Sequence, residues 1–236
     1  MKSIIDIHSH ILPCVDDGCG SKEEAIKMLK MYEAQGVEAV ICTPHHGPCG
    51  TTKQDVNEAF EWMLTTDTNV KLFLGNEIYY TPFTLDNVRD GYANTLSGSN
   101  HILVEFDEWY YYTPAVYILR ELEKMAKSEF KVILAHPERY TDLRKTLRNY
   151  KDITDMGVEL QINAYDLAES DNIITRYVTR YIVENQLASY IGSDAHGARR
   201  RAPSIKKGAE WIYANCPTEY ADAIVHDNAK KIIGGE

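Results

Sequence analysis

The sequence predicts an α/β protein whose parallel strands form a distorted, TIM-like barrel of seven strands, with a site at the carboxyl ends of those strands. Short, largely apolar segments alternate with helix-like segments along the chain, as expected for parallel strands joined by helical crossovers. Six of the seven apolar segments end at or shortly before a His, Asp or Glu residue. An open sheet places a site at one crevice, whereas a ring brings nearly all strand ends towards one centre. We therefore expect a barrel.

The seven expected strands are short and bounded by Gly, Pro, Asn or charged residues, as strands buried on both faces are. We place them at Ser3–Ile7, Glu38–Cys42, Lys71–Leu74, Ile102–Glu105, Lys131–Ala135, Val158–Ile162 and Ser189–Ile191. Among them, Val158–Ile162 is the strand that contributes no candidate site residue.

Helices are expected between these strands. Ser21 and Glu24 have the spacing of a capping box, in which each side chain satisfies a free backbone N–H at the start of a helix. The helix that follows, Glu23–Gln35, should end at Gly36, and Thr113-Pro114 should begin another. Further helices are expected at Gln54–Leu64, Thr141–Met156, Thr175–Asn185 and Ile205–Ala214 and after Pro217.

The segment Thr81–Ser99 has little periodic pattern, and we expect it to be a long loop over the site. The chain shows no linker, internal repeat or low-complexity tract. The simplest prediction is a single domain over residues 1–236.

Nine potential metal ligands stand at or shortly after the ends of the expected strands. They are His8, His10, Asp17, His45, Glu77, Glu105, His136, Asp194 and His196. Residues two apart in a strand face the same side, so His8 and His10 can bind one ion, and the same spacing separates Asp194 from His196. Each residue alone has an ordinary explanation, such as turn formation by Asp17. Together they would need too many unrelated explanations, and we predict a shared metal site.

The ligand set also indicates how many ions are bound and of what kind. At about four to six ligands per ion including water, nine residues suit two or three divalent metals. Imidazole and carboxylate without thiolate suit Mn, Fe or Zn. Adjacent divalent ions clamp a phosphate ester and activate water for its hydrolysis, so the pattern favours a phosphoester hydrolase.

Two basic positions near the ligands are candidate phosphate contacts. Arg139 follows His136 by three residues, and its planar guanidinium suits phosphate oxygens. The alternative is a surface ion pair with Glu138. Arg201, in the run Arg199–Arg201, is either a second phosphate contact or part of a solvated turn. Tyrosines near the strand ends either wall a pocket for an aromatic leaving group or simply pack: Tyr79, Tyr80, Tyr110, Tyr111 and Tyr112.

Composition excludes several classes of function. The net charge of −10 gives no field that would attract nucleic acid or an anionic membrane. The chain begins without a secretory signal pattern and has no apolar run of the roughly 18 residues needed to span a bilayer. We expect a cytoplasmic protein without membrane insertion.

The cysteines point away from thiol chemistry. The chain has five cysteines, an odd count that favours reduced thiols in a chain with no secretory signal. Cys14 and Cys19 have no second pair nearby to complete a structural zinc site. No cysteine is followed by Arg at the spacing Cys-x5-Arg, so a cysteine-dependent phosphatase is not expected.

The order of these motifs resembles the polymerase and histidinol phosphatase (PHP) superfamily. The matching motifs are His-x-His, Asp-Asp-Gly, Thr-Pro-His-His, two strand-end Glu residues, Ala-His-Pro-Glu-Arg and Ser-Asp-Ala-His, between Ile5 and about Arg201. The opening segment Asp6–Pro13 with Asp16-Asp17-Gly18 is most similar to the bacterial tyrosine-phosphatase branch of CpsB/YwqE-like capsule proteins.

The resemblance implies a distorted seven-stranded PHP barrel holding three metal ions, with Mn preferred. By motif, His8, His10, Glu77 and Asp194 would hold one ion. Glu77 would bridge to a second held by Glu105 and His136, and Asp17, His45 and His196 would hold the third. Arg139 matches the phosphate-binding arginine of the family, and Arg201 is a looser match.

The implied substrate is phosphotyrosine on a bacterial tyrosine kinase that controls capsular or exopolysaccharide export. The segment His46–Thr51 departs from the family pattern beside the site, which leaves substrate preference more open than metal binding. One alternative is a small-molecule phosphatase, such as a histidinol-phosphate phosphatase. Another is a non-catalytic scaffold that docks a kinase or polymerase. An oligomer is compatible with the sequence.

Overall fold

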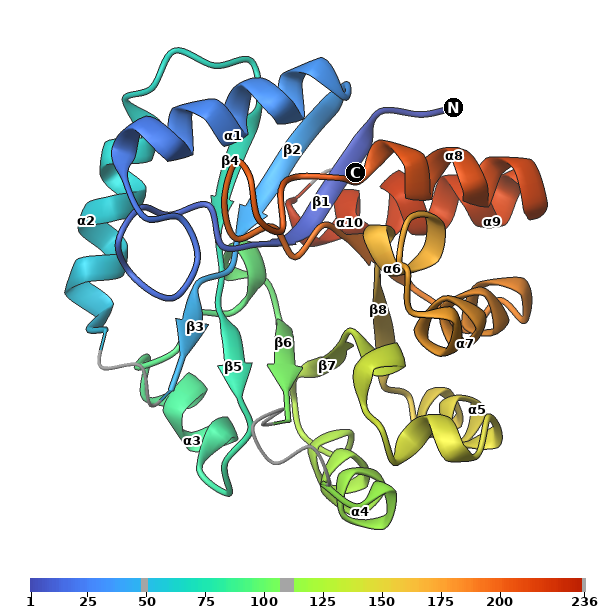
Figure 1. Ribbon diagram of the computed structural model, residues 1–236. Coiled ribbons are helices and arrows are strands. Elements are labelled where there is room, and N and C mark those ends of the chain that lie inside the picture. Colours follow the sequence, from blue (N-terminus) through green and yellow to red (C-terminus); the bar gives the residue numbers. More distant parts are fainter. Residues whose placement is uncertain (48–50, 107–112, 235–236) are drawn as a thin grey trace.

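The computed structural model describes residues 1–47, 51–106 and 113–234. All paired strands among these residues run parallel, and helices cover the outside of the strands (Figure 1). The strands are β1 (Ile4–Ser9), β2 (Val37–Cys42), β3 (His45–His46), β4 (Lys71–Leu74), β5 (Glu77–Tyr79), β6 (His101–Glu105), β7 (Lys131–Ala135), β8 (Glu159–Asn163) and β9 (Tyr190–Gly192). The predicted α/β class is confirmed, and every expected strand overlaps an observed one.

Strand pairing differs from one continuous seven-stranded sheet. Within the described residues, β1, β2 and β4 form one sheet, and β3, β5, β6, β7, β8 and β9 form another. The additional strands β3 and β5 each begin shortly after β2 and β4, beyond Thr43-Pro44 and Gly75-Asn76. Pro44 has no N–H to donate to the ladder, which accounts for an interruption there. The partners Cys42–Leu74 and His45–Glu77 keep the same offset, so pairing resumes in register after the break.

The first and last strands meet, which brings residues from both ends of the sequence together. Ser9 forms a parallel bridge with Ala195, three residues after β9 ends. His10 N–H donates to Ala195 O at 2.9 Å, and Asp194 N–H donates to His8 O at 2.8 Å. The candidate ligands on these two segments are therefore neighbours.

Most of the strands are buried on both faces, whereas β4 is only half-buried. Ile5 and Ile7 of β1 pack in one apolar cluster with Ile41, Leu103 and Ile133 of three other strands. The residues that alternate with these along the strands, such as Ile4 and Val40, belong to the larger apolar cluster that also contains residues of the helices. Alternation along each strand thus fills two apolar layers, which is why the segments read as continuous apolar runs.

The helices follow the predicted pattern with shifted ends. They are α1 (Lys22–Ala34), α2 (Lys53–Leu64), α3 (Thr84–Arg89), α4 (Ala115–Met125), α5 (Arg148–Asp155), α6 (Ala164–Ala168), α7 (Ile173–Glu184), α8 (Lys206–Asn215), α9 (Thr218–Asp222) and α10 (Asn228–Ile232), with a π-helical turn, Ala223–Asp227, before α10. Shorter 3-10 turns are η1 (Leu96–Gly98), η2 (Pro137–Arg139) and η3 (Leu143–Lys145). Across the described residues, every helix is too short or too polar to cross a membrane.

The predicted capping box at α1 is wrong in one half. Ser21 Oγ accepts the Glu24 N–H at 3.2 Å as expected. The Glu24 carboxylate instead accepts the N–H of Gly20 at 3.1 Å and that of Ala198 at 2.9 Å. Glu24 has a distant partner because the segment after His196 packs against the start of α1, and it ties the two together.

The prediction that Thr81–Ser99 forms a long loop over the site is also wrong. This segment contains α3 and η1. Leu96 is fully buried in the same cluster as Ile41 and contacts the space beside Gly75, where an added Cβ would lie 2.6 Å from a Leu96 methyl. A six-residue helix is too short to show clear periodicity, which is why the pattern gave no signal.

Candidate metal centre

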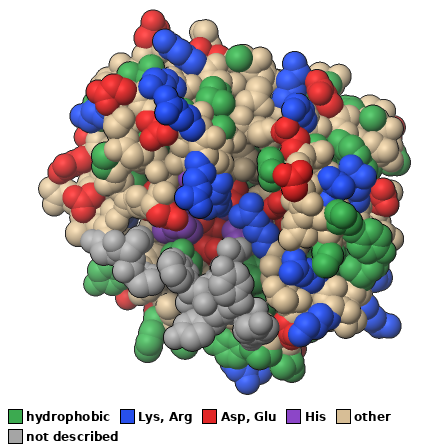
Figure 2. Space-filling model, viewed as in Figure 1, with side chains coloured by type: hydrophobic (Ala, Val, Ile, Leu, Met, Phe, Trp, Pro, Cys, Tyr) green, Lys and Arg blue, Asp and Glu red, His purple; other side chains and the backbone are tan. Residues whose placement is uncertain are grey.

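The nine predicted ligands converge at the carboxyl ends of the strands. Their side-chain donor atoms fall into overlapping groups in which the atoms lie within 4.8 Å of one another. The groups are His10, Asp17, His45 and His196; His8, His10 and Asp194; His8, Glu77 and His136; and His45, Glu77 and Glu105. Figure 2 shows histidine and acidic side chains in a recess that has Lys and Arg side chains along its upper edge.

His8, His10, Glu77 and Asp194 form the buried middle of the cluster. The Nε2 atoms of His8 and His10 lie 3.1 Å apart, and each is 3.1 Å from Glu77 Oε2. Each is also 3.6 Å from Asp194 Oδ1. These four atoms face one small volume, as the ligands of a single ion do.

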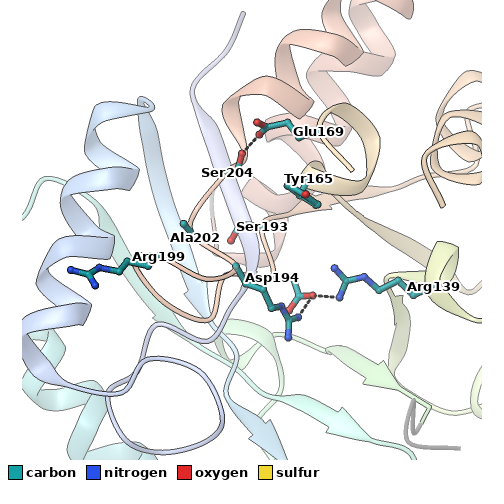
Figure 3. Close-up of a pocket in the computed structure, with 9 residues that line it drawn as sticks. Arg139, Tyr165, Glu169, Ser193, Asp194, Arg199, Ala202 and Ser204 are labelled. Atoms are coloured by element: carbon teal, nitrogen blue, oxygen red, sulfur yellow. Dashed lines mark hydrogen bonds and ion pairs between the residues drawn. The ribbon is translucent and has the colours of Figure 1, made fainter. Parts of the chain in front are cut away.

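Asp194 connects this volume to two arginines. Its outer oxygen, Oδ2, accepts hydrogen bonds from Arg139 Nη1 at 2.8 Å and Arg201 Nη2 at 2.5 Å (Figure 3). Arg139 Nε donates to Asp166 at 2.9 Å. The alternative in which Arg139 pairs with Glu138 is wrong, because Glu138 is buried and accepts the Asn163 N–H instead.

The arginines border an open cavity beside the cluster. Its volume is about 540 Å³, and its lining residues are Arg139, Tyr165, Glu169, Ser193, Asp194, Arg199, Arg201, Ala202 and Ser204. Arg139 and Asp194 extend towards each other in Figure 3, whereas Arg199 points away. The cavity therefore offers guanidinium donors next to the candidate ligands.

Glu77 occupies a position between several imidazoles. Its Oε1 lies 3.0 Å from His136 Nε2, and its Oε2 lies 3.2 Å from His45 Nδ1. Glu105 approaches the same two rings, at 3.7 Å from each. The two Glu77 oxygens thus face different partners, which is the geometry of a bridging carboxylate.

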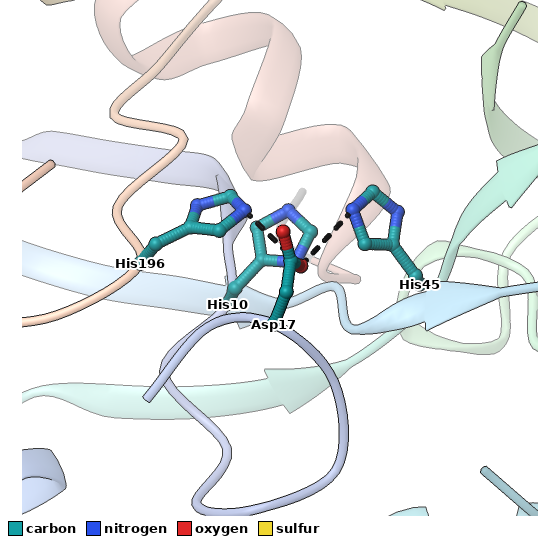
Figure 4. Close-up of side chains that lie close together, drawn as sticks. All are labelled: His10, Asp17, His45 and His196. Atoms are coloured by element: carbon teal, nitrogen blue, oxygen red, sulfur yellow. Dashed lines mark ion pairs between the residues drawn. The ribbon is translucent and has the colours of Figure 1, made fainter. Parts of the chain in front are cut away.

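Asp17 stands between two further imidazoles at the edge of the cluster. Its Oδ1 lies 3.5 Å from His45 Nε2 and 3.6 Å from His196 Nε2 (Figure 4). The Asp17 side chain is two-thirds exposed, unlike the buried rings around it. The turn that carries Asp17 therefore also places a carboxylate beside two of the candidate ligands.

Two candidate ligands have unusual backbone conformations. His136 has φ of 32° and Asp194 has φ of 52°, in the left-handed region that non-glycine residues rarely adopt. Such conformations cost on the order of 1–3 kcal/mol and persist where surrounding structure fixes them, often at functional sites. Both residues follow a strand end, where the turn aims the side chain into the cluster.

The electrostatic balance of the cluster suits a cation. Burial alone would raise the pKa of Glu77, but the surrounding imidazoles hold it well below its usual value. Burial alone would lower the pKa of His8, but Glu77 and Asp194 raise it. Burial lowers the pKa of His45 to about 4, which leaves its ring neutral at pH 7. The ionised carboxylates attract positive charge, and divalent ions bound through these atoms would supply it. The residues therefore fit a metal centre.

Asp16, the first residue of the Asp-Asp-Gly motif and not a predicted ligand, supports the cluster. Its Oδ2 accepts from His10 Nδ1 at 2.7 Å and from the His45 N–H at 3.0 Å. Metal-bound histidines commonly donate their second N–H to a carboxylate in this way. Asp166 was missed as well, and it orients Arg139. Its position in α6, directly after β8, is the one sequence signal that would have found it.

The tyrosines have separate roles. The Tyr79 ring stacks on His45 with centroids 4.6 Å apart. Tyr80 stacks on Phe106, and its hydroxyl donates to Glu121 at 2.7 Å. Tyr79 therefore borders the cluster and Tyr80 packs away from it. Tyr110, Tyr111 and Tyr112 lie outside the described residues.

Two of the thiols in the described part of the chain are poorly suited to act as nucleophiles. Cys14, Cys19, Cys42 and Cys216 are free thiols, and Cys49 lies outside the described residues. Burial raises the pKa of Cys19 to about 11, and it also raises that of Cys42. Thiols held protonated at neutral pH are poor nucleophiles.

A parallel α/β fold with buried imidazoles and carboxylates at its strand ends is typical of metal-dependent hydrolases. The chain matches the family described as "Capsular polysaccharide synthesis, CpsB/CapC" over residues 4–234, and it belongs to that family. The predicted family membership is confirmed.

Named relatives extend this result. The chain is 30% identical to the tyrosine-protein phosphatase CpsB of Streptococcus pneumoniae, over 98% of each chain. It is 27% identical to the tyrosine-protein phosphatase YwqE of Bacillus subtilis, over 84% of this chain and 79% of that protein.

Solved structures show the same fold. A structure from a study of YwqE and CpsB, described there as metal-dependent tyrosine phosphatases, matches with a TM-score of 0.87 and 22% identity. That match covers 99% of this chain and 96% of the other. A β-aspartyl dipeptidase from Fervidobacterium islandicum matches with a TM-score of 0.62 at 12% identity, which shows a likeness of fold alone.

Proposed function

We propose that this protein is a metal-dependent protein-tyrosine phosphatase that acts in capsular or exopolysaccharide synthesis. The observation that carries the proposal is Asp194. One of its oxygens faces the imidazoles of His8 and His10, and the other binds Arg139 and Arg201. A phosphate bound against the metals at this point would also meet guanidinium donors. The names of the relatives supply the substrate class.

We propose the following ligand sets. His8, His10, Glu77 and Asp194 hold one ion; Glu77, Glu105 and His136 hold a second; and Asp17, His45 and His196 hold a third. The distances around Glu77 support its bridging role. We propose Mn²⁺ as the preferred ion. We also propose that the two sheets together form one distorted seven-stranded barrel. In this barrel β2 and β3 count as one interrupted strand, and β4 and β5 count as another.

The chain's own residues orient the phosphoryl group. Bound divalent ions would supply Lewis acidity towards the ester. Asp166 fixes the plane of the Arg139 guanidinium, so that its Nη1 faces Asp194 and the cavity. Arg139 and Arg201 then donate to phosphate oxygens, where they stabilise the charge that develops in the transition state. Phenolate, with a pKa of about 10, is a fairly good leaving group, so hydrolysis does not require a strong general acid.

The proposed substrate is a phosphotyrosine-bearing bacterial tyrosine kinase, and the reaction would take place in the cytoplasm. We expect phosphotyrosine peptides to be hydrolysed with a kcat/KM at least tenfold above that for histidinol phosphate. The open cavity beside Asp194 is the physical reason, because it leaves room for an aromatic group attached to a peptide. Steady-state kinetics on both substrates measure this. A tenfold preference for histidinol phosphate would instead establish the small-molecule alternative.

Metal removal separates the enzyme from a non-catalytic scaffold. Treatment with a chelator should abolish hydrolysis of p-nitrophenyl phosphate, and added Mn²⁺ should restore it. The ions should also stabilise the fold, since a ligand at 100 times its Kd adds about 2.7 kcal/mol to the free energy of unfolding. Thermal unfolding with and without Mn²⁺ checks this second effect. If Mn²⁺, Fe²⁺ and Zn²⁺ all fail to support turnover, the scaffold becomes the better explanation.

A further inference from the structure

Strand β8 supplies none of the candidate ligands, yet it carries two polar side chains at its site end. Gln161 and Asn163 are both fully buried. They lie two residues apart in the strand, so they face the same side. Burying two amides is costly unless their hydrogen bonds are satisfied. Their partners therefore indicate what they do.

The two amides form a hydrogen-bonded chain between His8 and Asp194. Gln161 Oε1 lies 2.8 Å from His8 Nδ1. Gln161 Nε2 donates to Asn163 Oδ1 at 2.9 Å, and Asn163 Nδ2 donates to Asp194 Oδ2 at 3.0 Å. The chain begins and ends on candidate ligands of the same ion, since His8 Nε2 and Asp194 Oδ1 lie 3.6 Å apart.

The direction of this chain is fixed by the charge of Asp194. Asp194 Oδ2 also binds Arg139 and Arg201, so it is an ionised oxygen that only accepts. Asn163 must present its NH₂ to Asp194 and its oxygen to Gln161. Gln161 must then present its own NH₂ to Asn163 and its oxygen to His8. His8 Nδ1 is therefore the donor, and Nε2 is the nitrogen that remains to bind an ion.

Gly192 provides the space that this chain needs. Strand β9 pairs with β8, and the segment after it bridges to β1, so Gln161 must reach across β9 to contact His8. A Cβ added at Gly192 would lie 2.7 Å from Gln161 Nε2 and 2.8 Å from the His8 Cβ. Both distances are shorter than real contacts of this kind. Any side chain at Gly192 would displace the amide or the imidazole.

We propose that Gln161 and Asn163 are positioning residues that select the metal-binding nitrogen of His8 and hold Asp194 in place, with Gly192 as the required clearance. The inference rests on metal binding at the centre and not on the phosphotyrosine assignment. The test below uses metal alone, so its failure is distinguishable from failure of the proposed substrate.

The central test is Gln161→Leu, which keeps the volume of the side chain but removes the acceptor. In Zn²⁺-loaded protein labelled with ¹⁵N-histidine, the His8 Nδ1–H proton should give a downfield, exchange-protected resonance. In Gln161→Leu this resonance should move upfield or disappear, and Mn²⁺ affinity measured by competition with a chelator dye should fall about 10- to 100-fold. Gln161→Glu retains an oxygen for His8 and should keep the resonance, with a smaller loss of affinity.

Tyr190→Phe is the matched control. It removes a part-buried hydrogen bond, of 3.0 Å to Glu159, between the same two strands at their opposite end. It should leave both the His8 resonance and the Mn²⁺ affinity unchanged. If Gln161→Leu does not fold, Gly192→Ala takes its place, since it keeps both amides but displaces them. The variant to be judged is whichever of these two folds. The proposal would be overturned if its His8 resonance stays at the wild-type position, or if its Mn²⁺ affinity stays within twofold of the wild-type value.

Discussion

His136→Ala should abolish turnover and reduce the amount of metal that copurifies with the protein. His136 Nε2 lies 3.0 Å from Glu77 and 3.7 Å from Glu105, so it completes the proposed ligand set around Glu77. Without it, the proposed ion would lose a ligand, and the two carboxylates would lose a neighbouring imidazole. Metal-ion catalysis contributes several kcal/mol, which corresponds to a rate loss on the order of a thousandfold. Elemental analysis and p-nitrophenyl phosphate kinetics measure the two effects.

His101→Ala is the appropriate comparison for this experiment. His101 is also buried, but it begins β6, at the opposite end from Glu105, and its partners are Ser99 and Glu159. Its replacement should lower the unfolding temperature and leave metal content and rate per folded molecule unchanged. A His136→Ala protein with a full complement of metal would show that His136 is a packing residue.

Arg139→Ala should cut the rate strongly while leaving the metals bound. The Arg139 guanidinium lies 2.8 Å from Asp194 Oδ2, the oxygen that faces away from the imidazoles. Arg139 is therefore not one of the proposed metal ligands. Loss of a donor that stabilises transition-state charge costs a few kcal/mol, on the order of a hundred- to a thousandfold in kcat. Kinetics on a phosphotyrosine peptide and metal analysis of the same sample test both halves of the prediction.

Arg139→Lys separates charge from geometry. Lysine keeps the positive charge near Asp194 but lacks the planar fork that also binds Asp166. Its rate should therefore fall between those of the wild type and the alanine variant. Because removal of Arg139 leaves the buried Asp166 without this partner, unfolding temperatures must be compared as well. An alanine variant that is equally stable and turns over at the wild-type rate would reduce Arg139 to a structural role.

The candidate ligands could be identified from the sequence because most of them are chemically conspicuous side chains at or shortly after the end of an apolar strand. His8 and His10 show the two-residue spacing of a strand, and Glu77 and Glu105 stand where an unpaired carboxylate would be costly. The residues that hold these candidate ligands in place have no comparably conspicuous sequence signal. Asp16 reads as half of a turn, and the amides of Gln161 and Asn163 are uncharged. Their two-residue spacing within a buried strand is a signal of the same form, but it is weaker.

Strand boundaries were less predictable than strand existence. The short strand at His45–His46 was expected only as a site motif, because two residues show no periodicity. The hydrogen bond between Glu24 and Ala198 could not be predicted from the sequence, for a different reason. A contact between residues 174 positions apart follows from how the ends of the chain meet, which local pattern does not encode.

The junction of β1 with the segment after β9 has a consequence during synthesis. His8 and His10 are synthesised long before Asp194 and His196, which stand much later in the chain. A nascent chain therefore carries imidazoles and acids that cannot enclose an ion in this way until Asp194 and His196 have been synthesised. Metal loading should accordingly be a late event, and a truncated polypeptide that stops before Asp194 should not retain manganese.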